Sequence, residues 1–401
     1  MSDWFNTTLG DVVEVRVSNV DKKTMPGERS VRLCNYMDVY STNAVTPERS
    51  LMSASATESE YQRFRLLAGD VVITKDSESP DDIAIPTYIA PGIGKDVVCG
   101  YHLAMLRPKP DVDGHFLSYL LRLPEVNLHF AKVATGSTRY GLGLKSIHNA
   151  PLRIPKDVDE QRDIARILSA LDERIKQTDE LIEKFIARRA GLVQEFLMPE
   201  TLKAKCVTLA AVSSLVTSGS RGWARFYQTE GALFLRIGNL TRENPNLDLD
   251  DLVRVMVPAG GEGARTRLEA GDVLISITAD LGIIGCIPEN FEEAYINQHI
   301  ALVRINDASL NPRWVAHVLG SPFGNDQIAR LNDGGAKAGL NLSTIRALQV
   351  PKPSVEIQDL VVKLLDAADV QISAEKSFSA KLRLQKRGLM RDLLTGKTRV
   401  Q

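Results

Sequence analysis

Hydrophobic residues recur at heptad spacing between Asp159 and Leu197, and most positions between them are charged or polar. This pattern predicts an amphipathic helix of about forty residues, roughly 60 Å long at about 1.5 Å per residue. With Gln161 at heptad position a, the apolar seam comprises Ile164, Leu168, Leu171, Ile175, Ile182, Phe185 and Leu192. A helix of this length needs a partner that covers its seam.

The same pattern returns 197 positions later, between Glu356 and Leu394. The charge that interrupts the first seam at Arg189 recurs there as Lys386. Both seams are imperfect, so we expect the two helices to pack against each other as an antiparallel coiled coil. Two unrelated surface helices are the alternative, which is disfavoured because the repeat extends well beyond the helices. The second seam comprises Val361, Leu365, Ile372, Leu382 and Leu389.

Short β-rich runs alternate with turns in front of each long helix. The expected elements of the first half are strands at Asp11–Val17, Val31–Cys34, Asp70–Thr74, Asp82–Ile89 and Ala104–Arg107, and a short helix at His115–Leu123. Asp157 or Asp159 can cap the first long helix. We therefore expect a domain at residues 1–155, a long helix within 156–198, a second domain at 199–350, and the second long helix with a C-terminal tail at 351–401.

Motifs of the first half recur in order in the second half. The matched pairs are Arg32 with Arg236, Arg65 with Arg267, Ala68–Val71 with Ala270–Val273, His102–Arg107 with His299–Arg304, and Gly141–Leu144 with Gly339–Leu342. Their offsets drift between 197 and 204, which indicates short loop insertions inside a duplicated unit. The predicted fold class is mixed α+β: a tandem duplication of a β-rich α/β domain, each copy followed by a long α-helix.

This order of parts resembles the specificity subunit of type I restriction-modification systems. The motifs that carry the resemblance are AGDVV (68–72), AGDVL (270–274), NQHIALVR (297–304), GLNL (339–342) and the terminal LLTGKTRV. The first half departs from the pattern before His102, where Asn-Gln is missing, so a role of Asn297 and Gln298 does not transfer to it. The resemblance implies two target-recognition domains that read a bipartite DNA site, in a subunit without catalytic activity of its own.

The resemblance also implies partners. We expect double-stranded DNA, two modification (methyltransferase) subunits and restriction (endonuclease/translocase) subunits to bind, but no membrane. The complex is expected to use S-adenosylmethionine, ATP and Mg, with no cofactor or metal bound by this chain. Exposed apolar residues off the seams, such as Ile186, Val193 and Phe378, are the expected docking surface.

Comparison of the halves sorts the candidate DNA contacts. Residues shared by both halves serve the fold or the phosphate backbone, whereas base-reading residues should differ. The shared phosphate candidates are Arg32, Arg65, Arg139, Arg236, Arg267 and Lys337. The unshared base-reading candidates are Lys22, Lys23, Tyr36, Lys75 and Tyr140 in the first domain, and Arg221, Trp223, Arg225 and Arg242 in the second. Plain surface charge remains the alternative for each.

The strongest single loop is Ser218–Arg225, because its glycines permit close approach and its arginines can hydrogen-bond to bases. The alternative is an exposed turn with a half-buried Trp223. His102 and His299 lie within apolar runs and are interpreted as core or hinge residues. The loops at Gly141 and Gly339 are expected to turn the chain toward the helix, with a phosphate contact as the lesser possibility.

Composition changes the picture little. The net charge of −1 argues against non-specific binding of polyanions by the whole chain, and the four isolated cysteines argue against a zinc site. Gly396-Lys397-Thr398 lacks the earlier glycine of a phosphate loop, and no methyltransferase motif is present. Without a signal-peptide pattern or a long apolar run, a cytoplasmic protein of a bacterium or archaeon is expected. The remaining alternatives are the specificity component of a related type II system and a coiled-coil adaptor that does not bind DNA.

Overall fold

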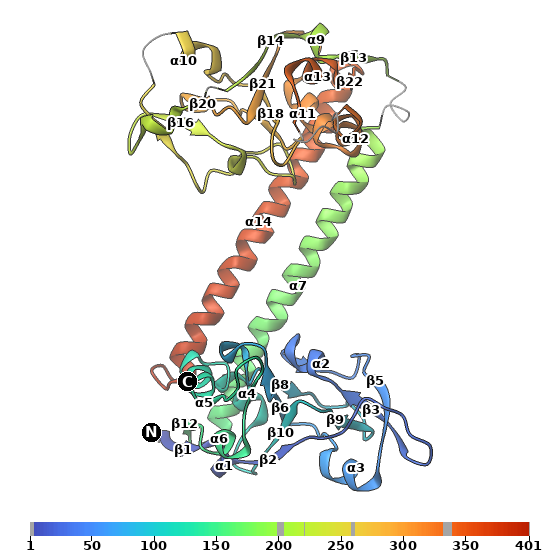
Figure 1. Cartoon of the computed structure of the whole chain (residues 1–401), viewed down its shortest axis with the longest axis vertical. Coiled ribbons are helices and arrows are strands. Elements are labelled where there is room, and N and C mark those ends of the chain that lie inside the picture. Colours follow the sequence, from blue (N-terminus) through green and yellow to red (C-terminus); the bar gives the residue numbers. More distant parts are fainter. Residues whose placement is uncertain (1–3, 199–203, 220, 258–260, 332–338, 401) are drawn as a thin grey trace. The chain divides into compact units, whose positions relative to one another are not determined.

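The computed structural model describes residues 4–198, 204–219, 221–257, 261–331 and 339–400 (Figure 1). The chain forms two compact units, one of residues 1–178 with 378–401 and the other of residues 179–377. The long helices α7 (Val158–Phe196) and α14 (Val355–Leu394) each contribute one part to each unit. None of the described helices is long and apolar enough to cross a membrane.

The first unit is built on a five-stranded sheet of order β2-β10-β6-β8-β4 and a three-stranded sheet of order β5-β3-β9, with small pairs β1-β12 and β11-β7. Its strands are β1 (Trp4–Thr8), β2 (Val13–Val17), β3 (Arg29–Cys34), β4 (Ala44–Val45), β5 (Met52–Ala56), β6 (Val71–Thr74), β7 (Asp76–Ser77), β8 (Pro86–Ile89), β9 (Val97–Cys99), β10 (Leu103–Pro108), β11 (Tyr140–Gly141) and β12 (Pro151–Pro155). Its helices before α7 are α1 (Leu9–Val12), α2 (Tyr36–Tyr40), α3 (Glu58–Phe64), η1 (Pro80–Asp82), α4 (Gly114–Leu120), α5 (Pro124–Val133) and α6 (Leu144–His148).

The second unit repeats this plan with sheets of order β14-β21-β18-β19, β15-β17-β16-β20 and β13-β22. Its strands are β13 (Cys206–Thr208), β14 (Ser213–Ser218), β15 (Tyr227–Gln228), β16 (Ala232–Leu235), β17 (Arg254–Val255), β18 (Val273–Ser276), β19 (Ile284–Cys286), β20 (Ala294–Ile296), β21 (Ile300–Ile305) and β22 (Gln349–Pro351). Its helices before α14 are α9 (Leu209–Val212), η2 (Trp223–Phe226), η3 (Ile237–Asn239), α10 (Gly261–Thr266), α11 (Pro312–Gly320), α12 (Pro322–Leu331) and α13 (Leu342–Ala347).

The predicted fold class is confirmed, with local corrections. The strand expected from Asp11 begins only at Val13, because Leu9–Val12 form the short helix α1. The strand expected at Asp82–Ile89 is only the four residues of β8, since Pro80–Asp82 form η1. α7 begins at Val158, where Asp157 accepts the backbone N–H of Asp159 at 2.9 Å and caps the helix.

The AGDV motifs are explained by a buried ion pair in each unit. Asp70 accepts two hydrogen bonds from the guanidinium of Arg107, at 2.9 and 2.7 Å, and Asp272 accepts two from Arg304, at 2.8 and 2.7 Å. Both aspartate side chains are almost completely buried, so each requires a fixed cationic partner. The motif therefore joins β6 to β10 and β18 to β21, and serves the fold.

The glutamine near the start of each long helix fixes that helix to its own domain. Gln161 is fully buried, accepts the N–H of Asp113 at 2.8 Å, and donates to the carbonyls of Pro155 at 3.0 Å and Asp111 at 3.2 Å. Gln358 accepts the N–H of Asn311 at 2.8 Å and donates in the same way to Pro353 and Ser309. These residues anchor the helix to the loop before α4 or α11.

The long helices pack antiparallel within each unit. In the first unit, Lys386 of α14 binds Asp172 of α7, and the guanidinium carbon of Arg174 lies 5.6 Å from the ring of Phe378. In the second, Arg189 of α7 binds Asp369 of α14. The charges that interrupt the two seams therefore occupy equivalent ion pairs.

The predicted seam positions face the helix partner or the domain to different degrees. Ile164, Leu168, Ile175, Ile182, Val361, Leu365, Ile372 and Leu382 are buried. Leu171, Phe185, Leu192 and Leu389 are half-buried. The apolar seam therefore continues through the parts of α7 and α14 that belong to each unit.

Candidate nucleic-acid interface

In the first unit, the predicted residues Lys75, Arg139 and Tyr140 gather around a sharp turn at Gly100–His102, here called the histidine turn. His102 adopts a left-handed conformation with φ of 70°, and its Nδ1 lies 2.6 Å from Oδ2 of Asp76. Lys75 donates its N–H to the carbonyl of His102 at 2.9 Å, and its ammonium lies 3.2 Å from Asp76. The guanidinium of Arg139 lies 3.4 Å from the imidazole. The turn therefore places Lys75 and Arg139 beside one another.

The second unit repeats the turn at Asn297–His299 with other side chains. Nδ1 of His299 lies 2.6 Å from the hydroxyl of Thr278, which stands where the first unit has Asp76. Nε2 of His299 lies 2.9 Å from the side-chain amide of Gln298. Ile277 donates its N–H to the carbonyl of His299 at 2.9 Å, as Lys75 does in the first unit. The same backbone hydrogen bond supports both turns, whereas their side chains and charges differ.

The glycine loops before α6 and α13 lie against these turns. Tyr140 and Gly141 pair with Ser77 and Asp76, and Gly339 forms a bridge with Thr278. The N–H of Leu142 bonds to Lys75 and that of Leu340 to Ile277, at 2.9 and 3.0 Å. Each glycine loop therefore forms part of the same surface as its histidine turn, with the Tyr140 side chain half-buried at its edge.

A loop that follows the first strand of each main sheet borders the histidine turn; we call residues 18–28 and residues 221–226 the edge loops. Tyr101 donates its N–H to the carbonyl of Val20 at 2.9 Å, and Lys22 and Lys23 are exposed beyond it. In the second unit, Gly219 donates to the carbonyl of Ile300 at 3.1 Å. A Cβ at Gly219 would lie 2.0 Å from the carbonyl oxygen of Asn297, so only glycine fits there.

Arg221 and Arg225 are exposed on the second edge loop, and Lys22 and Lys23 are exposed on the first. Each edge loop therefore carries two exposed cations next to the strand that borders its histidine turn. Edge loop, histidine turn and glycine loop thus form one surface in each unit, with cations suited to the DNA backbone and polar groups suited to base edges.

Trp223 is corrected. Its side chain is 2 % exposed and stacks on Phe234 and Tyr295 at centroid distances of 5.4 Å, inside a small aromatic core. The prediction that Trp223 reads bases was wrong, because Phe234 of β16 and Tyr295 of β20 supply an apolar surface that buries the indole. Trp223 anchors the edge loop and is not available to a base.

The pairing of Arg32 with Arg236 is also wrong. Arg32 lies within β3, and its backbone N–H donates to Asp96 in front of the partner strand β9. In β16 it is Leu233 whose N–H donates in the same way, to Glu293 in front of β20. Leu233 is therefore the counterpart of Arg32. The short similar sequences around Arg32 and Arg236 placed the alignment of the two halves three residues out of register. Arg32 binds Asp96 at 2.8 Å, and Arg236 binds Asp251 at 2.7 Å, so the two arginines do not form a matched phosphate pair.

The other candidates have separate positions. Arg65 and Arg267 are equivalent, since each forms a β-bridge to the matching strand, and the Arg267 side chain is 62 % exposed. Arg242 is bound to Asp280 and also bonds to the carbonyl of Leu281 at 2.9 Å. Lys337 lies outside the described residues.

Tyr36 connects the histidine turn of the first unit to a neighbouring groove. Burial raises the pKa of its hydroxyl, with a further contribution from the carboxylate of Asp82, and the hydroxyl of Ser77 lies beside it. Its ring stacks on Tyr40 at 5.6 Å. Sequence analysis missed Asp76 and Tyr101, although the replacement of Asn-Gln by Gly-Tyr before His102 marked this turn as different.

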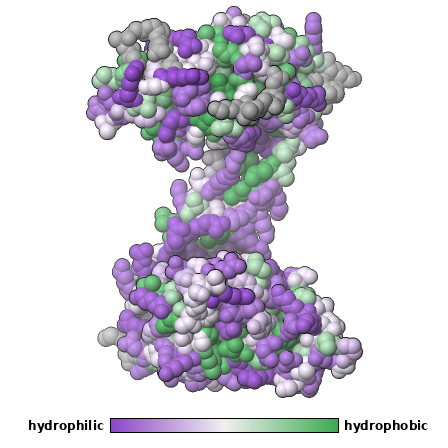
Figure 2. Space-filling model, viewed as in Figure 1, coloured by the Kyte–Doolittle hydropathy of each residue, from purple (hydrophilic) through white to green (hydrophobic). Residues whose placement is uncertain are grey.

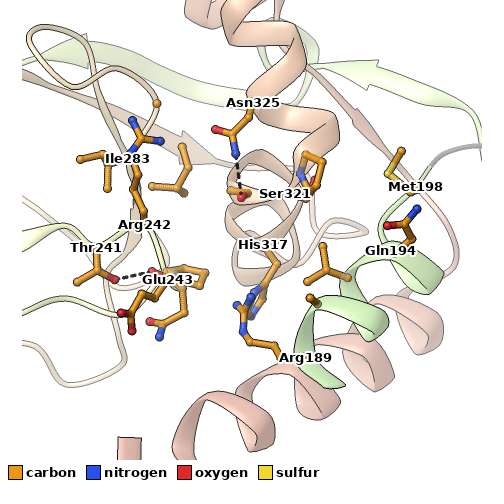
Figure 3. Close-up of a pocket in the computed structure, with 18 residues that line it drawn as sticks. Arg189, Gln194, Met198, Thr241, Arg242, Glu243, Ile283, His317, Ser321 and Asn325 are labelled. Atoms are coloured by element: carbon orange, nitrogen blue, oxygen red, sulfur yellow. Dashed lines mark hydrogen bonds between the residues drawn. The ribbon is translucent and has the colours of Figure 1, made fainter. Parts of the chain in front are cut away.

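The second unit also contains a cavity of about 330 Å³ between the end of α7, the loop at Thr241–Pro245 and α11 (Figure 3). Arg242 lies on the loop side of the cavity, and Arg189 and His317 come from the helices. His317, Asp366 and Asp369 could offer three metal ligands within 4.8 Å of one another. Among the described residues, however, Asp366 already binds Arg313 at 2.6 Å and Asp369 binds Arg189, so the group is an ion-pair network.

Comparison with known proteins agrees with this architecture. Residues 1–184 match the family model described as the type I restriction modification DNA specificity domain. The chain is 21 % identical to the putative type I restriction enzyme MjaX specificity subunit of Methanocaldococcus jannaschii, over all of this chain and 94 % of that protein. It is 20 % identical to the MjaVIII specificity subunit of the same organism, over 77 % of this chain and 76 % of that protein.

A solved S subunit from M. genitalium superposes with a TM-score of 0.63 at 14 % identity, over 98 % of this chain and 96 % of that one. A chain from a structure on assembly and conformational transition of the type I R-M system gives 0.52 at 17 % identity, over 98 % and 97 %. These two likenesses show the fold. The sequence matches show that the chain is similar to type I restriction-modification specificity subunits, with the family model covering its first 184 residues.

Proposed function

We propose that each unit reads one half of a bipartite DNA site through its edge loop, histidine turn and glycine loop. The observation that carries the proposal is the duplicated surface: the same backbone hydrogen bonds support it in both units, but the side chains on it differ. A shared backbone with different side chains suits two domains that bind the same polymer and read different bases. The two half-sites need not be related by symmetry.

The long helices are proposed to set the gap between the half-sites. α7 has 39 residues and α14 has 40, so each is about 60 Å long at about 1.5 Å per residue. Gln161 and Gln358 fix each helix to its own domain, and the ion pairs Asp172–Lys386 and Arg189–Asp369 fix it to its partner helix. A helix pair held in this way is stiff enough to keep a constant spacer.

The same helices are proposed to hold the modification subunits. Ile357, Leu360 and Leu364 are 44 %, 59 % and 39 % exposed, and their spacing places them on one face of α14. Figure 2 shows hydrophobic side chains interrupting the hydrophilic surface of the helices. Three residues were predicted from the sequence to form the docking surface. Ile186 and Phe378 are each 38 % exposed, but the prediction for Val193 was wrong, because it is buried in the core of the second unit.

In this proposal the chain itself is not catalytic. The methyltransferase subunits would bring S-adenosylmethionine, and restriction subunits would bring ATP and Mg. The chain contributes recognition and scaffolding, which its two interfaces and its paired helices can provide without a reactive centre.

The test is to express the chain with its modification subunit and to map methylated adenines across a genome. A bipartite motif with a constant gap is expected. Random or absent methylation by a folded complex contradicts the proposal, and a complex that assembles but does not shift DNA indicates a protein adaptor.

Replacing Arg221 and Arg225 with Ala tests the surface itself. Both side chains are exposed, so the fold should be unaffected. We expect weaker binding to cognate DNA, with the slope of log K against log salt reduced by about 0.9 for each phosphate that the variant no longer binds. Unchanged affinity removes the edge loop of the second unit from the interface. Arg188→Ala, an exposed change on α7, is the control.

A further inference from the structure

The first unit has a groove of about 450 Å³ next to its DNA-reading surface, and two exposed methionines line it. Met37 on α2 is 59 % exposed, and Met52 at the start of β5 is 43 % exposed. Large apolar side chains are seldom left in water at adjacent positions unless they bind something. The groove is also lined by Lys22, Asn35, Tyr36, Asp38, Ser50 and Leu51.

The groove borders the surface proposed to read DNA, and its charges suit a polyanion, because Asp38 in its lining is already paired with Arg49 at 3.1 Å. Lys22 of the edge loop forms part of its wall, and Lys23 is exposed beside it. Tyr36 joins the groove to the histidine turn, because its hydroxyl lies by Ser77, which pairs with Tyr140 of the glycine loop. An apolar floor with a cationic rim complements a DNA groove, whose phosphates flank the apolar parts of the base edges.

The repeat shows that a methionine at position 37 is not required by the fold. The N–H of Asn35 bonds to the side chain of Asp38, and the N–H of Arg236 bonds to that of Asn239, both at 2.9 Å. These matching caps make Gly238 the counterpart of Met37. The second unit therefore forms the same turn without a side chain at this position.

We propose that Met37 and Met52 read thymine by contact with its C5-methyl group. The major groove is where this methyl is displayed, and apolar contact with it distinguishes thymine from cytosine. Unbranched thioether side chains can adjust to the position of a methyl group and bury it. The inference rests on the proposed DNA-reading function and adds that thymine is a required base of the half-site bound by the first unit.

The experiment uses the full chain in complex with its modification subunit and the duplex motif defined by methylation mapping. Exchange of residues 1–155 for those of a relative with another motif identifies the half-site of the first unit. Thymines of each half-site are then replaced, one at a time, by deoxyuridine, which removes only the methyl group. We expect Kd to rise about fourfold for each contacted methyl in the first unit's half-site, the effect of burying about one methylene-sized group.

Met37→Ala and Met52→Ala are expected to abolish the difference between thymine and deoxyuridine while the bipartite motif is kept. Met256→Ala, an equally exposed methionine of the second unit, is the matched control and should keep the difference. The inference is overturned by a half-site without thymine, by an unchanged Kd with deoxyuridine, or by variants that lose the modification subunit instead. Failure of the proposed function is distinguishable, because no bipartite motif would then be found.

Discussion

The two units share their backbone scheme but differ beneath α4 and α11. In the first unit, Tyr119 donates to Asp172 at 2.7 Å and Arg122 reaches the carbonyl of Pro86. Counting from the equivalent caps Asp113 and Asn311, the second unit has His317 and Gly320 at these positions. The smaller side chains leave the cavity of about 330 Å³ in the second unit.

This difference separates residues that every copy needs from residues that each copy can vary. The buried Asp–Arg pair, the helix-anchoring glutamine and the ion pair between the helices recur in both units. The side chains packed beneath α4 and α11, and those of the edge loops, differ between the units. Shared residues therefore report on stability, and unshared ones on what each unit reads or leaves open.

The largest expected effect comes from Asp70→Ala and Asp272→Ala. Each change leaves a partly buried guanidinium, that of Arg107 or Arg304, without its buried carboxylate; Arg304 keeps the exposed carboxylate of Glu269 at 2.6 Å, which in water compensates little. We expect the free energy of unfolding to fall by about 3 kcal/mol in either case, measured by denaturant titration. Asp81→Ala, an exposed change, is the control. A large loss of stability for only one of the two variants would show that the two Asp–Arg pairs are not equivalent.

Arg189→Met and Lys386→Met should have unequal effects. Asp369 is 1 % exposed and Asp172 is 23 % exposed. Loss of Arg189 therefore leaves a more deeply buried carboxylate without its cationic partner than loss of Lys386 does. We expect losses of about 3 and about 1 kcal/mol. Burial already raises the pKa of Asp369. In Arg189→Met the folded form should therefore bind a proton more readily than the unfolded form. The loss in free energy of unfolding that this variant shows at pH 7 should shrink as the pH falls toward 5. A constant deficit would contradict this assignment.

Gln161→Leu and Gln358→Leu test how the helices are anchored. Each removes three hydrogen bonds and leaves the N–H of Asp113 or Asn311 without its partner. We expect a loss of about 2 kcal/mol and faster hydrogen exchange in the first turns of the affected helix. Gln177→Leu, which removes a bond at 2.8 Å to the exposed side chain of Glu173, should change stability by less than about 0.5 kcal/mol.

The smallest expected effect is a gain in stability, from Gly320→Ala in the second unit. A Cβ at Gly320 would lie 3.8 Å from the Cβ of Ile284, which is ordinary contact. Gly320→Ala should raise the stability of the second unit by about 0.5 kcal/mol, because alanine restricts the unfolded chain. A loss measured by thermal unfolding would show that the cavity wall has no room.

Periodicity and repeated motifs were enough to predict the tandem fold and the antiparallel helices. They did not predict the role of Gln161, which heptad spacing assigned to the seam although it bonds to the domain backbone. They also misjudged Trp223 and the pairing of Arg32 with Arg236, because strand register and aromatic packing depend on contacts between distant segments. The gathering of Lys75, Arg139 and Tyr140 could not be predicted either, since three separate loops meet at His102 only in the folded chain.

The most direct test of the central claim is a matched insertion of one heptad into both long helices. In the second unit, Arg189 opposite Asp369 sets the register, which places Lys184 of α7 opposite Ala374 of α14. One heptad after each residue lengthens the pair by about 10 Å, or about three base pairs of duplex. Mapping of methylated adenines should show the same bases at both ends with a gap about three base pairs longer. A folded, active variant that keeps the original gap, or that reads different bases, would contradict the account.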